Sequence, residues 1–124
     1  MNMWIQLHDF STKEMGDVTL SQSTEALSTF DWQSELSKRD ESDDETCDPG
    51  LGLVAGDETI LHICPQGPDE YTVHYLHPVR KKILGFIPFH SQKNHFISSC
   101  PTSTATKLIE YHFDGKRDEI LKTK

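Results

Sequence analysis

Residues 51–77 read LGLVAGDETILHICPQGPDEYTVHYLH, and this stretch decides the fold class. Three runs within it are rich in β-branched, aromatic and other apolar residues, a composition typical of strands. The connections between the runs are short, polar and rich in Gly and Pro, whereas a parallel return needs a dozen or more residues. Hairpins are therefore predicted, and an antiparallel meander is the expected sheet. The three predicted strands are 51–55, 59–64 and 71–77.

Alternation within these strands separates their side chains onto two faces, because successive side chains of a strand point to opposite sides. Tyr71, Val73 and Tyr75 alternate with Thr72 and His74. One face is expected to meet the helices and the other to remain partly wet. Further strands are predicted at 3–8, 83–89 and 94–98.

Two helices are predicted from apolar residues at helical spacing. The first covers 23–38, with Ser23 or Thr24 as its N-cap. The second covers 101–114 and ends before Gly115, a residue typical of the position after a helix. Its apolar stripe follows the i, i+3, i+4, i+7 pattern and comprises Ala105, Leu108, Ile109, His112 and Phe113.

These elements predict one α+β domain over residues 1–124, with a five- to six-stranded antiparallel sheet and two helices packed on one face. The length of 124 residues suits a single hydrophobic core. Eleven aromatic residues supply large buried areas, which favours a folded domain over a disordered chain.

An acidic run, DESDDETCDPG, occupies residues 40–50 and is predicted to be a loop that Pro49 and Gly50 close as a turn. It belongs to an acidic half, since residues 1–58 carry 14 Asp and Glu against three Lys and Arg, a net charge of −11. Residues 59–124 carry six acidic against nine basic side chains, a net charge of +3. Phosphate contacts need clustered Lys and Arg, so this balance disfavours nucleic acid and favours a basic protein partner.

The three cysteines, Cys47, Cys64 and Cys100, are odd in number and widely spaced, so no disulfide framework is expected. A reduced, cytoplasmic setting is the simplest account of them. The longest apolar runs are only a few residues, so no membrane span is expected. The first residues lack the charged and apolar regions of a signal peptide.

The seven histidines lack the tight ligand spacing of a zinc site. His74 and His77 are three residues apart on a predicted strand, which places their side chains on opposite faces. His62 and His74 are candidates for cross-strand neighbours. His112 is on the apolar helix face and is expected to be a satisfied core or boundary residue. No metal or cofactor is expected.

Other constellations have two interpretations each. The acidic run is either a solvated linker or a partner-facing loop, and the loop is the preferred interpretation. Its carboxylates are consecutive, whereas a calcium loop needs alternate ones around a central Gly, which disfavours a metal site. Cys100 precedes Pro101 at a predicted helix start, where a lowered thiol pKa and a histidine base would make a nucleophile. A small buried hydrophobe is the preferred interpretation of these cysteines. The basic triplet at 80–82 is expected to cap a hairpin and to keep an edge strand from self-pairing.

The second half of the chain has a recognisable order of elements. An acidic turn leads through the strands GLGLVAG, ILHI, YTVHY and ILGFIPF to a proline-led helix with Ala105, Phe113 and Gly115. This order resembles the small immunity proteins of bacterial polymorphic toxin and contact-dependent inhibition systems, especially those paired with deaminase-type toxins. The resemblance covers roughly residues 48–121. It implies a cytosolic, non-enzymatic domain that binds one cognate toxin and blocks its active site.

The sequence thus predicts an immunity protein that binds and occludes a basic, nucleic-acid-targeting toxin domain, as a monomer or weak dimer. One alternative is a small thiol–histidine enzyme, which requires Cys64 or Cys100 in a pocket within hydrogen-bond reach of a histidine. Another is an acidic DNA-mimicking inhibitor with evenly spaced rows of carboxylates. Acidic residues would face the toxin and aromatics would anchor the interface. The predicted partner-binding residues are Asp40, Glu41, Asp43, Asp44, Glu45, Asp48, Trp32 and Phe30.

Overall fold

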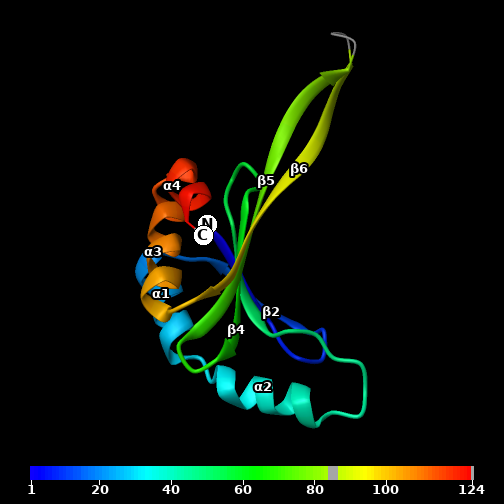
Figure 1. Ribbon diagram of the computed structural model, residues 1–124, viewed down its shortest axis with the longest axis vertical. Coiled ribbons are helices and arrows are strands. Elements are labelled where there is room, and N and C mark those ends of the chain that lie inside the picture. Colours follow the sequence, from blue (N-terminus) through cyan, green and yellow to red (C-terminus); the bar gives the residue numbers. More distant parts are fainter. Residues whose placement is uncertain (84–86, 124) are drawn as a thin grey trace.

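The computed structural model describes residues 1–83 and 87–123, and for 78–83 and 87–93 it describes the backbone alone. Six strands form one sheet in the order β2-β1-β3-β4-β5-β6, and each neighbouring pair is antiparallel (Figure 1). This confirms the predicted α+β class with an antiparallel sheet. The strands are β1 (Asn2–Gln6), β2 (Thr12–Asp17), β3 (Gly50–Val54), β4 (Ile60–Gly67), β5 (Glu70–Ile83) and β6 (Ile87–Cys100).

Four helices accompany the sheet in the described residues, whereas the sequence predicts two. Three of them, α1, α3 and α4, lie along one face of the sheet in Figure 1, as predicted for the helices. The other, α2, lies beyond the end of the sheet in the same view. The helices are α1 (Leu20–Thr29), α2 (Trp32–Glu41), α3 (Thr102–Phe113) and α4 (Arg117–Lys122).

The predicted helix 23–38 is divided into α1 and α2. The carboxylate of Asp31 accepts a hydrogen bond from the backbone N–H of Ser34 at 3.1 Å, so Asp31 is the N-cap of a second helix. The division also explains why Trp32 and Leu36 fall off the apolar stripe of the first half. Both residues belong to α2, which has a different orientation from α1, and their side chains are buried there.

The first helix begins at Leu20, three residues before its predicted start. Thr19 caps α1 in a reciprocal pair with Gln22, in which each side chain bonds the backbone N–H of the other residue. The predicted caps, Ser23 and Thr24, lie inside the helix. Their hydroxyls donate to backbone carbonyls of the preceding turn.

The C-terminal helix agrees with its predicted range. Pro101 is the N-cap of α3, and Gly115 follows the helix with a φ of +70°. In α4, Ile120 is fully buried. The buried positions of α3 are Ala105, Leu108, Ile109 and His112.

The β5–β6 hairpin is longer than predicted, because β5 is not interrupted at Pro78 and the basic triplet. The backbone of β5 continues through Pro78, opposite Gln92, and through the basic triplet at 80–82. Beyond Leu76, β5 has β6 as its one paired neighbour among the described residues, and proline is tolerated where a strand lacks a second partner. The triplet is therefore within a strand of the projecting hairpin (Figure 1). The middle of the predicted strand 83–89 lies outside the described residues.

The edge strand β2 has no sequence signal of the kind that predicts β3 to β5. Its sequence, TKEMGD, does not alternate, and all six residues are exposed. It is a strand because it pairs with β1 across a bulge next to Trp4.

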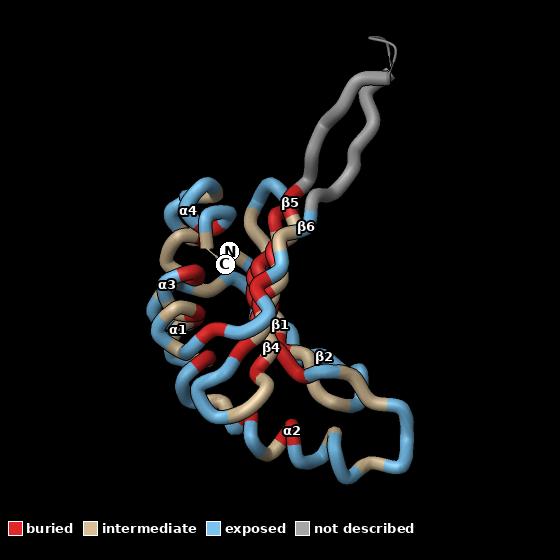
Figure 2. The backbone as a smooth tube through the Cα atoms, in the orientation of Figure 1, coloured by how far each residue is buried: buried red, intermediate tan, exposed pale blue. Residues whose placement is uncertain are grey.

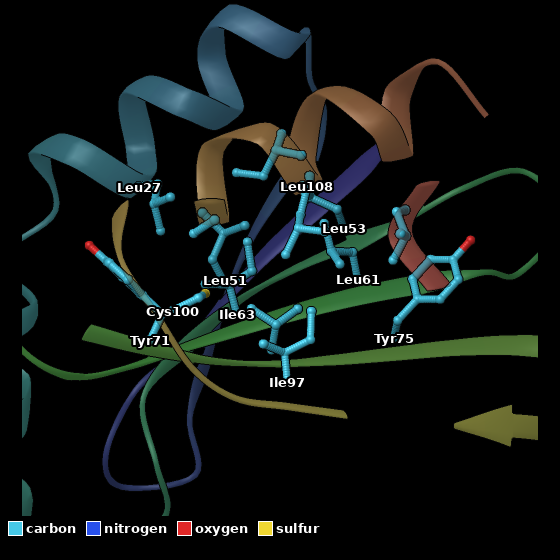
Figure 3. Close-up of a cluster of buried hydrophobic side chains, with 14 of the residues drawn as sticks. Leu27, Leu51, Leu53, Leu61, Ile63, Tyr71, Tyr75, Ile97, Cys100 and Leu108 are labelled. Carbon is cyan, nitrogen blue, oxygen red and sulfur yellow. The ribbon is translucent and has the colours of Figure 1, made fainter. Parts of the chain in front are cut away.

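The core lies between the sheet and α1, α3 and α4, where Figure 3 shows Leu27 and Leu108 facing the sheet. None of the helices formed by the described residues is long and apolar enough to cross a membrane. The fully buried sheet residues include Leu51, Leu53, Leu61, Ile63 and Val73.

Candidate protein-binding site

The sheet has a second face, which points away from α1, α3 and α4 (Figure 1). In β4, Leu61 and Ile63 are fully buried toward the helices, whereas His62 and Cys64 alternate with them and are half-buried. The same alternation of buried and partly exposed residues continues along β5 (Figure 2). This confirms the prediction of one packed and one partly wet face, and we call the second one the open face.

Four aromatic rings form a row across the open face. Antiparallel pairing places Trp4 opposite Gly52, Gly52 opposite His62, His62 opposite His74, and His74 opposite Phe96. The predicted cross-strand pairing of His62 with His74 is thereby confirmed. We call Trp4, His62, His74 and Phe96 the aromatic row.

Ring contacts hold the aromatic row in place. The centroids of Trp4 and His62 are 5.1 Å apart, and those of His74 and Phe96 are 6.0 Å apart in an edge-to-face arrangement. Trp4 reaches His62 across β3 because Gly52 has no side chain. Phe96, at the other end, is 62% exposed although it belongs to a strand.

A pocket of about 500 Å³ opens beside the aromatic row at His62, His74 and Phe96. Two carboxylates line it: Asp48, from the acidic run, and Glu70, from the start of β5. No lysine or arginine is among the described residues that line it, so this lining is acidic. The other residues that line it are Cys64, Gln66, Thr72 and Ser98.

Cys64 is in this pocket with its Sγ atom 3.5 Å from Nε2 of His62, the arrangement that the thiol–histidine alternative requires. Burial, with a smaller contribution from the charges of Asp48 and Cys47, raises the pKa of the Cys64 thiol to about 12. Burial and the neighbouring His74 lower the pKa of His62. Both groups are therefore neutral near pH 7, whereas a nucleophilic cysteine needs a thiolate.

The other two cysteines are also free thiols. Cys100 is buried, in agreement with the preferred interpretation, and its burial raises the pKa of the thiol, opposite to the lowering that a nucleophile at the start of α3 requires. The thiol of Cys47 donates a hydrogen bond to the carbonyl oxygen of Leu7 at 3.2 Å. The hydrogen bond of Cys47 and the burial of Cys100 are typical of cysteines with a structural role.

All six predicted carboxylates of the acidic run are exposed. Arg39 forms ion pairs with two of them, Asp40 at 3.1 Å and Asp48 at 2.7 Å. The other four have no ion-pair partner among the described residues, and we call them the acidic surface. They are Glu41, at the end of α2, and Asp43, Asp44 and Glu45, in the loop that follows.

The acidic run does not end in the predicted turn. Pro49 is fully buried, and Gly50 is the first residue of β3. A Cβ on Gly50 would be 2.8 Å from Nε2 of His62, so glycine is needed there for space rather than for a turn conformation. This entry into the sheet brings Asp48 to the edge of the pocket.

The two predicted aromatic anchors have different surroundings from those expected. Trp32 is 5% exposed, and its indole N–H donates to the carbonyl oxygen of Leu27 at 2.9 Å. Phe30 is half-buried, with its ring centroid 4.4 Å from that of Trp32. Trp32 is therefore a core residue, because α2 turns its apolar side inward, and Phe30 packs against it.

Two further histidine predictions, those for His77 and His112, agree with the structure. His77 is buried on the helix side of the sheet, opposite to the half-buried His74. Nε2 of His112 donates a hydrogen bond to the carbonyl oxygen of Leu53 at 3.0 Å. Among the residues whose side chains the structure describes, no three of the types His, Cys, Asp and Glu are placed to hold a metal ion.

Sequence reasoning missed Trp4, Gly52 and Phe96 as parts of one surface. The available signal was the alternation of side chains along the strands, which separates the two faces of the sheet. Joining the five positions into a row required the register of four strand pairs, which the sequence does not state.

No protein-family model, curated protein or solved structure gives a significant match to this chain. The geometry of the open face and of the acidic surface is thus the basis for a functional proposal.

Proposed function

We propose that the protein is an immunity protein that binds a basic, nucleic-acid-targeting toxin domain in the cytoplasm and neutralises it by covering its active site. The observation that carries the proposal is the acidic surface. Its four carboxylates are exposed, close together in the chain and without a cation partner among the described residues. A domain that acts on nucleic acid needs a positively charged cleft, and the acidic surface is complementary to one.

Electrostatics gives the acidic surface two roles. Like charges in one short segment repel, and a basic partner relieves that repulsion when it binds. The same field attracts the partner at long range and raises the association rate at low ionic strength. Rapid capture suits an inhibitor that must reach a toxin before the toxin reaches its substrate.

The cysteines and the pocket support binding rather than catalysis. Three free thiols suit a reducing compartment. The pKa of about 12 for Cys64 deprives the thiol–histidine alternative of a thiolate. The carboxylates of the acidic surface come from one helix end and one loop, whereas those of a DNA mimic are spaced in rows.

Titration calorimetry with the toxin domain encoded beside this gene tests the proposal, at low and at physiological salt. Neutralising the acidic surface should weaken binding by at least about tenfold at low salt, with a smaller loss at high salt. The variant carries Glu41→Gln, Asp43→Asn, Asp44→Asn and Glu45→Gln.

A matched control removes the same charge from exposed carboxylates elsewhere and should change the affinity less than about twofold. Equal losses in the two variants would reduce the effect to net charge, and an unchanged affinity in both would exclude the acidic surface from the interface. The control carries Glu25→Gln, Glu58→Gln, Asp114→Asn and Asp118→Asn.

A further inference from the structure

We infer that the pocket on the open face binds an arginine side chain of the protein partner, stacked on Phe96 and paired with Glu70 and Asp48. The inference rests on the proposed function, for which it names the contact chemistry. It also extends the interface from the acidic surface to the sheet, since Asp48 belongs both to the acidic run and to the pocket.

Phe96 supplies the stacking surface. It is the most exposed large hydrophobic residue among those that the structure describes, and it projects from a strand beside a pocket. His74 contacts its ring edge-to-face, which limits the orientations of the ring. A planar guanidinium stacks on such a ring and gains from the negative potential of its face.

Asp48 and Glu70 supply the charge. Glu70 is exposed and has no ion-pair partner in the described part of the chain. Asp48 already binds one guanidinium, that of Arg39, through Oδ1 at 2.7 Å, and its side chain remains 56% exposed. The unpaired carboxylate of Glu70 and the exposed remainder of Asp48 are complementary to a group with several donors and a positive charge.

Other occupants fit the same surface less well. The base of a nucleotide would stack on Phe96, but the negative phosphate would then approach the negative carboxylates of Asp48 and Glu70. A second copy of this chain would bring the same carboxylates to the interface. Lysine offers a charge without a plane to stack, so arginine matches both features of the pocket.

A titration of the intact protein followed by two-dimensional NMR tests the inference. The probes are the blocked tripeptide Gly-Arg-Gly and its citrulline analogue, which has the same shape without the charge. We expect saturable shifts for Phe96 and its neighbours on β4 and β5 with the arginine peptide, at a Kd on the order of millimolar. Citrulline should bind at least about tenfold more weakly.

Two pairs of variants assign the site. Phe96→Ala and Glu70→Gln should each abolish saturation. Phe10→Ala and Glu58→Gln are the controls, since Phe10 is 58% exposed and Glu58 is exposed away from the pocket, and they should leave binding unchanged.

Three results would overturn the inference: equal binding of citrulline, binding of a nucleoside monophosphate at this face in place of arginine, or self-association through this face on dilution analysis. The fate of the proposed function is separate. A toxin that still depends on the acidic surface while the arginine peptide fails would reject the pocket alone. Arginine binding without toxin binding would retain the pocket and reject the immunity function.

Discussion

The indole of Trp4 lies against Gly52 so closely that a Cβ on Gly52 would be 2.2 Å from Cε2 and Cζ2 of the ring. The two residues are opposite one another in the β1–β3 pair. Their contact lets the indole cross β3 and reach His62, with 5.1 Å between ring centroids. Gly52 is therefore needed for the space that the indole occupies on the open face, rather than for a turn conformation.

Gly52→Ala is therefore expected to destabilise the protein by about 1–3 kcal/mol, because the new methyl group displaces the indole from the sheet. Urea unfolding followed by circular dichroism measures the change. Gly56→Ala is the control, since a Cβ there meets nothing within 4 Å, and it should change stability by less than about 0.5 kcal/mol. In a Trp4→Ala background the cost of Gly52→Ala should largely disappear, and an undiminished cost would contradict the contact as its cause.

Cys64 is expected to resist alkylation. Its thiol pKa of about 12 leaves very little thiolate near neutral pH, so iodoacetamide should react on the order of a thousandfold more slowly than with a free cysteine at about pH 8. Peptide mass spectrometry after timed labelling measures the rate at each cysteine. Unfolding in urea should restore ordinary reactivity. Rapid labelling of Cys64 in the folded protein would contradict the raised pKa and support the thiol–histidine alternative.

Stability should decrease as the pH falls below the ordinary histidine pKa of about 6.5. Burial lowers the pKa of His112, partly opposed by its hydrogen bond to Leu53, and burial with His74 lowers that of His62. The unfolded chain then binds protons that the folded protein does not, so the free energy of unfolding drops with acid between the unfolded and folded pKa values.

His112→Gln keeps an amide donor for the Leu53 carbonyl and removes the titration. The slope of unfolding free energy against pH, measured by urea titrations from about pH 7 to 5, should become shallower in this variant. An unchanged slope in the His112 variant would contradict the linkage.

The break between α1 and α2 should depend on one carboxylate. Asp31→Ala removes the acceptor for the Ser34 N–H and should cost about 1 kcal/mol, whereas Asp31→Asn keeps an acceptor and should cost a few tenths. Thermal and urea unfolding of the two variants provide the comparison. Equal costs would show that the charge of Asp31, rather than its capping bond, supports α2.

The parts of the fold that follow from local patterns were predictable. Alternation in β4 and β5 separated the side chains into two sets, one for each face of the sheet, and the stripe of α3 followed from its periodicity. The break at Asp31 was obscured because Ser, Thr and Asp occur throughout 23–38, so several residues offer caps. β2 was missed because pairing with β1, rather than its own sequence, makes it a strand.

The candidate site divides in the same way. The acidic surface could be predicted from the sequence, because its four residues are close together in the chain. The pocket is not, since Asp48, Glu70 and Phe96 come from three segments that only strand pairing brings together. Trp32 was misplaced because the direction of its ring depends on where α2 starts.

Trp32 and Phe96 should therefore respond oppositely to truncation. Trp32→Ala opens a cavity and leaves the Leu27 carbonyl without its indole donor, so it should cost about 3–5 kcal/mol of stability. Phe96→Ala removes a ring that is 62% exposed, so stability should change by less than about 0.5 kcal/mol while partner affinity falls about tenfold or more. Urea unfolding and calorimetric titration with the toxin domain measure the two quantities separately. Where Trp32→Ala weakens binding, stabilising the variant with osmolyte should restore it, because its effect acts through folding; no osmolyte should restore binding to Phe96→Ala.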